Sequence, residues 1–452
     1  MTATRAVISG FHNYTEAQQA LFGTWKKKLG DTFSRHGFVQ FHPRPAELKE
    51  NLKAGGIGHE VYQINRMTDG QETELALPFD RTVPFALWIN EHAQETVFPY
   101  KRQQIDISWR AERAQAARFR AFYQADVDMV GPNLGPLADV ECITTLYEGL
   151  ESLGFNNFRM SLNHMSISKA MLKSLNLSEE NLKEALRLVD KLDKLPEDDV
   201  ANQIIQLNSN LDADAVKALV SSFNFRGSIS GFTLREEWGQ EAVDGLANLK
   251  NLFHNLGQFG VDTSRLDFCP GMVRGLNYYT GPVFETHLEG DGKALGSIAS
   301  GGRFDDLIPG LTEGKNLPGV GGSIGLTRLF DIYQRTLKPE EAEKVLRKKS
   351  DADCVVLFHQ DADMEKGIQI AKALRENGLN VELYTEGSKM KLPHKLDYVN
   401  KKGIPLAVMA FSDDVSVRDM EAGTQEKYAS EEKAIAAIIA LKRNEAAFAG
   451  AV

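Results

Sequence analysis

The chain has 452 residues and a net charge of −10, with 42% hydrophobic and 25% charged residues. This length suits two or three domains, and the composition is typical of a soluble globular protein with a core. The acidic balance argues against uniform positive charge for nonspecific nucleic-acid binding, although local basic patches remain compatible with it. The sequence shows no apolar run long enough for a membrane span and no secretory signal, so a cytoplasmic protein is expected.

The cysteines also limit the class of protein. Cys142, Cys269 and Cys354 lie far apart in the sequence and form no CxxC pair. No group of histidines and cysteines has the spacing of zinc ligands. We therefore expect no disulfide framework and no structural metal, and we expect each cysteine to be a small buried residue.

The N-terminal part begins with a clear helical pattern. Thr15 and Gln18 have the spacing of a capping box, and apolar residues recur on one face, which predicts a helix over residues 15–36. Short strands are expected over residues 37–48. From about residue 74 to 131 the pattern is strand-like, with one long loop.

Residues 166–259 differ from their surroundings, because leucines there recur at helical spacing. Leucines at this spacing usually pack a core, so we interpret the stretch as a helical insertion between two parts of one larger domain. Strands and glycine-rich turns return over residues 268–330. We predict that residues 1–335 form this domain and that residues 336–352, rich in Lys, Glu and Arg, form a linker.

Beyond the linker, strand and helix patterns alternate over residues 353–452. Strands are predicted at 354–358, 381–384 and 404–410, and helices at 364–377 and 392–402. A glycine follows each of these helices, as is common at helix ends. The alternation predicts a small α/β domain with a largely parallel sheet.

The most informative stretch is residues 105–131, in which two alternating arms flank an arginine-rich loop. Each arm has one polar face, and on the second arm that face carries Gln124, Asp126 and Asp128. Guanidinium groups bind phosphate and carboxylates bind ammonium, so we interpret the hairpin as a site for a phosphorylated ligand and a cationic one. The alternative is a surface hairpin with solvated charges, which the repetition of polar residues on one face of both arms disfavours.

Two further stretches combine glycine with arginine. In the first, Arg274 precedes Tyr278 and Tyr279, and a turn then leads into a strand. In the second, residues 297–329, closely spaced glycines lead to Arg328. Glycines let the backbone approach a ligand, and an arginine binds phosphate. The spacing is not GxGxxG, which argues against a Rossmann dinucleotide site.

Together these stretches resemble the histidyl-tRNA synthetases, a family of class II aminoacyl-tRNA synthetases. The hairpin is similar to motif 2 in its histidyl form, and residues 269–286 are similar to the histidine A motif. Residues 300–305 resemble the second histidine motif, and residues 319–328 resemble motif 3. Residues 75–84 resemble the strand whose acidic residue and threonine hold the histidine ammonium group.

The resemblance implies an α+β catalytic domain, with an antiparallel sheet flanked by helices and the helical insertion described above. Residues 37–48 resemble motif 1, the dimer-forming element, and the family implies a homodimer. The α/β domain at residues 353–452 would bind the anticodon. Its candidate RNA contacts are Lys389, Lys391 and Lys395.

The implied reaction activates L-histidine with ATP and transfers it to tRNA(His). Mg²⁺ would accompany ATP, and no metal would be held by protein residues alone. The residues that would stabilise the reacting phosphate are Arg110 and Arg274. The residues that would bind histidine are Asp80, Thr82, Gln124, Asp128, Tyr278 and Tyr279. The residues that would bind ATP are Arg110, Glu112, Arg113 and Arg328, and those near the tRNA acceptor end are Gln115, Arg118 and Arg120.

Two loop residues depart from the family pattern, because many relatives have proline at the position of Ala114 and glycine at that of Ala117. The main alternative function is that of a regulatory paralogue that binds histidine without charging tRNA. Such proteins usually lack the last domain and part of the ATP-binding set, whereas this chain keeps Arg110, Arg274 and Arg328. A second alternative, a tRNA sensor, would need an attached effector domain for which no residues remain.

Overall fold

The computed structural model describes residues 8–52, 60–67, 73–273, 278–290, 296–308, 317–386 and 390–449. The chain divides into two compact units. Unit 1 comprises Met1–His12 and Trp25–Thr336, and unit 2 comprises Asn13–Thr24 and Leu337–Val452. Within the described ranges, no helix combines the length and the apolar character needed to cross a membrane.

Unit 1 is built around an eight-stranded sheet. Its strands in spatial order are β1 (Val39–Gln40), β4 (Tyr100–Trp109), β5 (Ala121–Val130), β10 (Gly319–Ile324), β9 (Ala299–Arg303), β8 (Pro282–Leu288), β6 (Phe158–His164) and β7 (Leu266–Phe268). The five central pairs are antiparallel, and the two edge pairs, β1 with β4 and β6 with β7, are parallel. This confirms the antiparallel sheet expected for a class II synthetase. A separate two-stranded sheet pairs β2 (Glu47–Leu48) with β3 (Leu75–Ala76).

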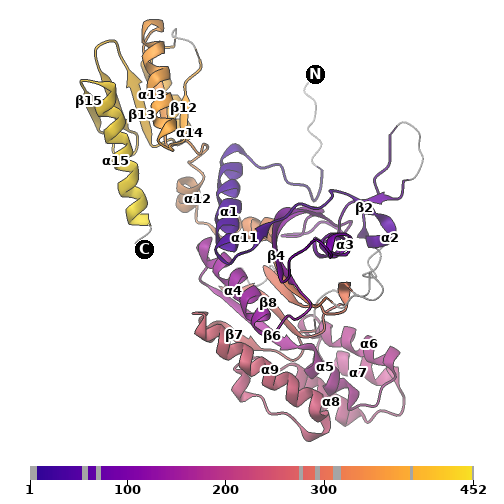
Figure 1. Cartoon of the computed structure of the whole chain (residues 1–452). Coiled ribbons are helices and arrows are strands. Elements are labelled where there is room, and N and C mark those ends of the chain that lie inside the picture. The colour runs from indigo at the N-terminus through magenta and orange to yellow at the C-terminus, as the bar shows by residue number, and fades with distance from the viewer. Residues whose placement is uncertain are drawn as a thin grey trace. The chain divides into compact units, whose positions relative to one another are not determined.

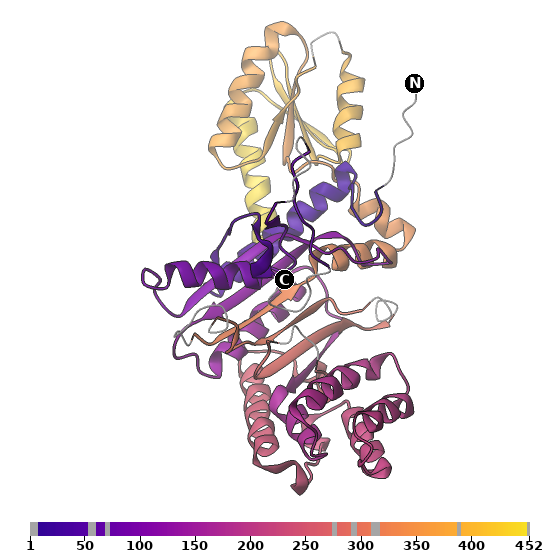
Figure 2. The ribbon, with the colours of Figure 1, turned by 90° about the vertical axis from the view of Figure 1, so that its right-hand side faces the viewer.

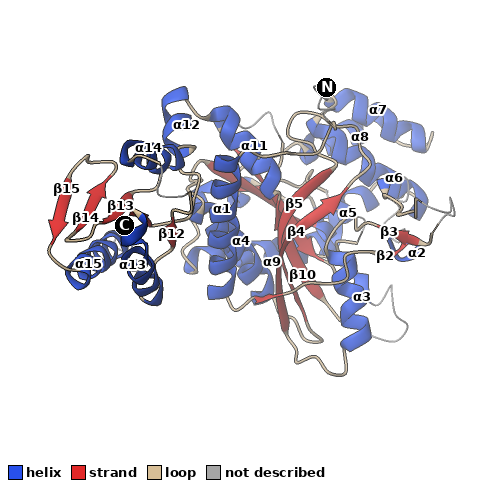
Figure 3. Ribbon diagram, turned by 90° about the horizontal axis from the view of Figure 1, so that it is seen from above, coloured by secondary structure: helices blue, strands red, loops and turns tan. Residues whose placement is uncertain are grey.

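Helices cover one face of the large sheet. These include α1 (Glu16–Arg35) and α4 (Leu137–Ser152), which lie along the central strands in Figure 3. Gly149 of α4 lies so close to Leu29 and Phe33 of α1 and to Ile324 of β10 that an added Cβ would meet each of them within 3.3 Å. The predicted N-terminal helix is confirmed, and Thr15 and Gln18 exchange the hydrogen bonds expected of a capping box.

The opposite face is partly covered by α3 (Thr82–His92). Phe85 and Ile89 of α3 pack with Val130 of β5 and with Phe304, which follows β9. The strand-like pattern predicted from residue 74 to 131 is wrong for this segment. A helix buried around much of its surface shows no clear period, and five of the eleven residues of α3 are buried.

The start of α3 also corrects the expected place of the acidic residue near residue 80. Asp80 lies on a turn before the helix, not on a strand, and its Oδ1 accepts a hydrogen bond of 2.9 Å from the Val83 amide. A carboxylate that caps free amides at a helix N-terminus stabilises the helix, and this position fixes the orientation of the carboxylate. Thr82 is the first residue of the helix.

Helices fill the predicted insertion. They are α5 (Met165–Lys173), α6 (Glu179–Val189), α7 (Glu197–Leu207), α8 (Ala213–Phe223) and α9 (Gly239–Gln258). Figure 1 shows them grouped beside the β6–β7 end of the sheet. The leucine spacing reflects packing, since Leu182 and Leu188 of α6 are buried. The insertion ends where β7 joins the edge of the sheet beside β6.

Unit 2 contains a five-stranded sheet. Its strands in spatial order are β12 (Val381–Leu383), β11 (Cys354–Phe358), β13 (Leu406–Ala410), β14 (Val415–Asp419) and β15 (Gln425–Tyr428). The first three are parallel, which confirms the predicted α/β alternation. The prediction of a largely parallel sheet is wrong for β14 and β15, which run antiparallel because short turns connect them.

The helices of unit 2 lie on both faces of this sheet, as Figure 2 shows. Residues of α13 (Met364–Glu376) and α15 (Glu431–Ala449) pack with Val356 on one face. Residues of α14 (Leu392–Lys402) pack with Val355 on the other. The segment expected to be a linker contains a short helix, α12 (Pro339–Val345). Another short helix, α2 (Lys49–Leu52), belongs to unit 1.

The predicted RNA contact at Lys395 is contradicted by its burial. Only 1% of Lys395 is exposed, and its ammonium group donates a 2.7 Å hydrogen bond to the Phe358 carbonyl. The same group lies 4.9 Å from the centroid of the Phe358 ring, so Lys395 is part of the core of unit 2. Lys391 is exposed at the start of α14. Lys389 lies outside the described residues.

Candidate active site

The β4–β5 hairpin brings the polar residues predicted from the sequence onto one face of the sheet. In the antiparallel register Asp106 lies opposite Gln124, and Arg102 lies opposite Asp128. Residues two apart on a strand share a face, so Gln124 and Asp128 both point toward the face that α3 partly covers. The prediction of a polar row on this face of the hairpin is therefore confirmed.

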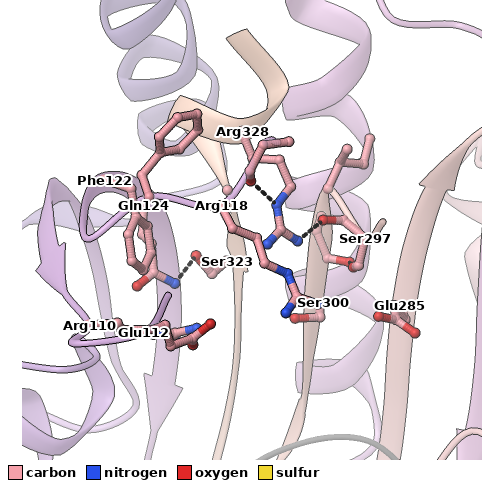
Figure 4. A pocket seen from close by; sticks show the side chains of 15 residues that line it. Arg110, Glu112, Arg118, Phe122, Gln124, Glu285, Ser297, Ser300, Ser323 and Arg328 are labelled. Carbon is pink, nitrogen blue, oxygen red and sulfur yellow. Dashed lines mark hydrogen bonds between the residues drawn. The ribbon is translucent and has the colours of Figure 1, made fainter. Parts of the chain in front are cut away.

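A pocket of about 240 Å³ opens over this face, as Figure 4 shows. It lies over β5, β10, β9 and β8 and beneath the loop of the hairpin. Its lining consists of Arg110, Glu112, Ala117, Arg118, Phe119, Phe122, Gln124, Glu285, Ser297, Ile298, Ala299, Ser300, Ser323, Gly325 and Arg328. Residues predicted for ATP, histidine and the tRNA acceptor end thus meet around one cavity.

Three arginines converge on this pocket. Arg110 comes from the end of β4, Arg118 from the loop, and Arg328 from the first turn of α11 (Leu326–Thr336). The pKa of Arg328 is lowered, first by burial and then by the charges of Arg118 and Arg110. Mutual repulsion among three guanidinium groups favours binding of an anion between them. The pocket is therefore suited to a polyphosphate.

Aromatic rings hold the first of these arginines. The guanidinium carbon of Arg110 lies 4.3 Å from the centroid of the Phe79 ring and 5.1 Å from that of Phe122. Contacts of this kind orient a guanidinium group without using up its hydrogen-bond donors. Arg110 is therefore held in place while most of its donors can still bind a ligand.

Arg328 connects the floor of the pocket to the loop above it. Its Nε donates to the Ala117 carbonyl at 2.9 Å, and its Nη1 donates to the Ser297 carbonyl at 2.7 Å. Ala117 lies in a tight turn, closed by two backbone hydrogen bonds between Gln115 and Arg118, and has a φ of 55°. Such a φ favours glycine, which is the residue that the family resemblance predicts at this position.

A second group of residues lies deeper on the same face. Tyr278 and Tyr279 contact each other with ring centroids 4.9 Å apart. The pKa of each phenol is raised, mainly by burial and also by the charges of Asp80 and Asp128. These two carboxylates, which we call the acid pair, therefore lie near the two tyrosine rings. Two carboxylates and two phenols grouped in this way are suited to bind an amine that also carries a ring.

Asp128 is a buried carboxyl at the centre of this group. It is 1% exposed and forms an ion pair with Arg102. Burial raises its pKa to about 7, although Arg102 opposes the shift. Burial also raises the pKa of Asp80, and Arg110 is one of the charges that oppose this effect. A perturbed carboxyl pair in a concave polar site is typical of a ligand-binding centre.

Several predicted residues lie at the rim of the pocket or away from it. Arg113 and Gln115 are exposed on the loop. Arg120 donates from its Nε to the Glu112 carbonyl at 3.1 Å and packs against Gly10, so it braces the loop. Arg274 lies outside the described residues.

Three residues around the site were missed in the sequence. Glu285 of β8 lines the pocket, and Arg81 and Arg102 are buried beside the acid pair. Arg102 could have been found from the sequence, because the alternation of β4 places it on the polar face. Arg81 could not have been found in this way, since its burial depends on how the turn before α3 folds over the sheet.

The site offers few protein ligands for a metal ion. In the part of the chain that the structure describes, no three or more His, Cys, Asp or Glu side chains are grouped to hold one. Glu112 and Glu285 line the same pocket as the three arginines. One or two carboxylates together with substrate phosphates are the usual ligands of Mg²⁺. The lining therefore fits a magnesium ion that arrives with a nucleotide.

Comparison with known proteins identifies the family. The sequence profile described as histidyl-tRNA synthetase matches residues 10–329. The chain belongs to the histidyl-tRNA synthetase family. It is 33% identical to the histidine–tRNA ligase of Clostridium tetani over 438 residues, which cover 94% of this chain and 96% of the relative. It is also 33% identical to the histidine–tRNA ligase of Xanthomonas axonopodis pv. citri over 436 residues, 89% of each chain.

Solved structures agree with this membership. The histidyl-tRNA synthetase of Nostoc sp. PCC 7120 superposes with a TM-score of 0.83, at 28% identity, over 98% of this chain and 100% of that one. The match therefore includes both unit 1 and unit 2.

Proposed function

We propose that the chain ligates L-histidine to tRNA(His) in two steps that take place over the β4–β5–β10 face of unit 1. The pocket containing Arg110, Arg118 and Arg328 carries this proposal, because three guanidinium groups converge on the same sheet face as a buried group of two carboxylates and two phenols. Membership of the histidyl-tRNA synthetase family supports the same reaction.

In the first step, a carboxylate oxygen of histidine attacks the α-phosphorus of ATP, and pyrophosphate leaves. Arg110, which lines the pocket and whose charge acts on Asp80, stabilises the negative charge that develops on the α-phosphate, together with Arg274 by family resemblance. Arg328 binds the γ-phosphate, and Glu112 and Arg113 position the nucleotide. Reaction then depends on alignment and charge stabilisation, as in other phosphoryl chemistry.

Histidine is bound by the deeper group of residues. The acid pair and Thr82 receive the ammonium group, and Gln124, which lines the arginine pocket on the same strand as Asp128, donates or accepts a hydrogen bond. Gln124 is itself oriented by a 3.1 Å hydrogen bond to Ser323. Tyr278 and Tyr279 surround the imidazole ring.

In the second step, the 3′-terminal ribose hydroxyl of tRNA attacks the carbonyl carbon of the adenylate, and AMP leaves. The loop above the pocket approaches the acceptor end through Gln115, Arg118 and Arg120, and unit 2 binds the anticodon. ATP enters with Mg²⁺, for which Glu112 and Glu285 are the nearest pocket carboxylates. We further infer a homodimer that acts in the cytoplasm, from the family resemblance alone.

The proposal is tested by charging. Purified protein, ATP, Mg²⁺ and labelled histidine should form a base-labile histidyl ester on tRNA(His), and not on a tRNA of another specificity. No other amino acid should be esterified under the same conditions. A protein that leaves tRNA(His) uncharged at saturating histidine would refute the proposed ligation.

A further inference from the structure

Arg102 of β4 is a fully buried cation close to the proposed histidine pocket. Its exposed fraction is 0%. The guanidinium carbon lies 4.9 Å from the centroid of the Phe85 ring and 5.9 Å from that of Phe41. A buried guanidinium group is costly unless other groups compensate its charge and bind its hydrogens. The groups that compensate the charge of Arg102 and bind its hydrogens therefore show which parts of the site it connects.

One terminal nitrogen of Arg102 links the two elements that carry the acid pair. Its Nη2 forms an ion pair with Asp128 of β5 and donates to the Arg81 carbonyl at 3.0 Å. Arg81 directly follows Asp80 in the turn before α3. The other terminal nitrogen, Nη1, donates to Gln104 at 3.0 Å, which fixes the plane of the guanidinium group. Arg102 therefore ties Asp128 to the turn that carries Asp80.

The charges around this link are nearly balanced. Three carboxylates and two guanidinium groups are buried together, namely Asp80, Asp126, Asp128, Arg81 and Arg102. With all five ionised, one negative charge remains, which a single ammonium group would neutralise. Without Arg102, two uncompensated negative charges would be buried, and protonation of a carboxyl would then compete with ligand binding.

We propose that Arg102 is a positioning residue for histidine: it holds the acid pair in a fixed arrangement and favours the charged form of Asp128, which receives the ammonium group. This inference rests on the proposed function, in which the acid pair binds histidine. Arg102 does not line the arginine pocket, so its effect on ATP is expected to be small.

Asp128 is surrounded by groups from several elements, which matter for the dependence on pH. The charged and titratable groups near it on the same face are Arg102 of β4, Asp126 of β5, Asp80 of the turn before α3, and Tyr278 and Tyr279 before β8, while Cys142 of α4 lies across the sheet. Among these, only Arg102 is a cation. Its removal should therefore raise the pKa of Asp128, so that loss of histidine affinity extends to higher pH.

The test compares Arg102→Met, which keeps a linear side chain without charge, with Arg102→Lys, which keeps the charge. The readout is histidine-dependent exchange of pyrophosphate into ATP, measured from pH 6 to pH 9. We expect the histidine KM of Arg102→Met to rise on the order of 10- to 100-fold, as for loss of a hydrogen bond to a charged group. The ATP KM should stay within about threefold.

Arg102→Lys should recover most of the histidine affinity, with a pH profile closer to that of the wild type. The matched control is Arg159→Met, which removes a bidentate pair with Asp267 at the β6–β7 edge of the same sheet, at 2.8 and 2.7 Å. This control should leave the histidine KM and its pH profile unchanged. If Arg102→Met does not fold, Arg102→Lys still tests the idea, because it keeps the charge: a histidine KM raised more than about 10-fold in a folded Arg102→Lys, with the wild-type pH profile, would contradict the proposed role of that charge.

The outcomes separate this inference from the proposed function. A folded Arg102→Met with the wild-type histidine KM would overturn the inference. The inference would also be overturned if the histidine KM and the ATP KM rose by the same factor while the melting temperature fell, because these changes together indicate a structural role only. Absence of exchange in the wild type would instead contradict the proposed function itself.

Discussion

At the scale of single residues, the site combines a carboxyl that is costly to ionise with arginines that need an anion. Burial raises the pKa of Asp128 to about 7, and it lowers the pKa of Arg328, whose cationic neighbours act in the same direction. Both effects weaken when a ligand supplies the opposite charge. The ammonium group of histidine would compensate the charge of Asp128, and the phosphates of ATP would compensate the charge of Arg328. Substrate binding should therefore lower the electrostatic cost of both buried charges.

Asp128→Asn tests the carboxyl. The folded-state pKa of about 7 lies above the usual value near 4, so the folded protein binds more protons between these pH values. Ionisation of Asp128 therefore lowers the stability of the free protein as the pH rises through this window, and a bound ammonium group restores it. Thermal stabilisation by histidine should increase from pH 6 to pH 8 in the wild type, and this increase should be lost in Asp128→Asn.

The imidazole of the histidine ligand titrates in the same pH range, but it affects the wild type and Asp128→Asn equally. The difference between the two proteins in thermal stabilisation by histidine therefore reports the ionisation of Asp128. Calorimetric titration should also give an affinity for histidine that is weaker by about tenfold or more at pH 8 in the variant. An identical pH dependence in the two proteins would show that the carboxyl does not bind the ammonium group.

At the scale of elements, the close packing of β10 against β5 explains its glycines. A Cβ on Gly321 would lie 1.9 Å from the Asp128 Oδ1 atom and 2.9 Å from the Val127 carbonyl. Glycine at this position therefore gives the carboxylate of Asp128 the space it occupies. The motif 3 glycines, expected to admit a nucleotide, thus include one that shapes the histidine side of the site.

Gly321→Ala should displace Asp128 and destabilise the protein by about 1–3 kcal/mol, as overpacking of a core does. Its histidine KM should rise more than its ATP KM. Gly23→Ala is the control, because a Cβ at this helical position has nothing within 4 Å and should stabilise the protein by about 0.5–1 kcal/mol. Chemical denaturation and exchange kinetics measure both effects. Equal stability of the two variants would contradict the packing argument.

The sequence could predict elements whose pattern is local. The β4–β5 hairpin, the N-terminal helix and the helices after Cys354 follow from alternation, spacing and glycine stops. The helix α3 could not be predicted, because it is buried around much of its surface and its apolar residues therefore do not recur with a helical period. The burial of Lys395 also escaped prediction, since a lysine at a helical position is usually solvated and only the fold places it over Phe358.

The same distinction holds within the site. Gln124 and Asp128 were predictable as one polar row, because a strand repeats every two residues. The partnership of Arg102 with Asp128 depends on the register of β4 against β5, which alternation alone does not fix. Its second partner, the Arg81 carbonyl, depends on a turn more than twenty residues away in the sequence.

At the scale of the whole molecule, the two units suggest a division of labour between activation and tRNA binding. The arginine pocket and the acid pair both lie in unit 1. The candidate RNA contact Lys391 lies in unit 2. Substitutions in unit 2 should therefore affect charging of tRNA but not exchange of pyrophosphate.

Two lysines test this division, Lys391 just before α14 and Lys395 within it. Lys391→Ala, at an exposed position, should raise the tRNA KM severalfold while stability changes by less than about 0.5 kcal/mol. Lys395→Ala should cost about 2–4 kcal/mol, because it leaves a cavity and an unpaired carbonyl. Charging kinetics and denaturation distinguish the two. Loss of pyrophosphate exchange in Lys391→Ala would contradict the separation of roles.

The central claim is that unit 1 forms an adenylate of histidine, and histidine-dependent exchange of pyrophosphate into ATP tests it most directly. We predict exchange with histidine and with no other standard amino acid, reduced about 10²- to 10³-fold by Arg110→Ala. Binding of histidine without any exchange would contradict the claim, and it would favour a regulatory histidine-binding protein built on the same fold.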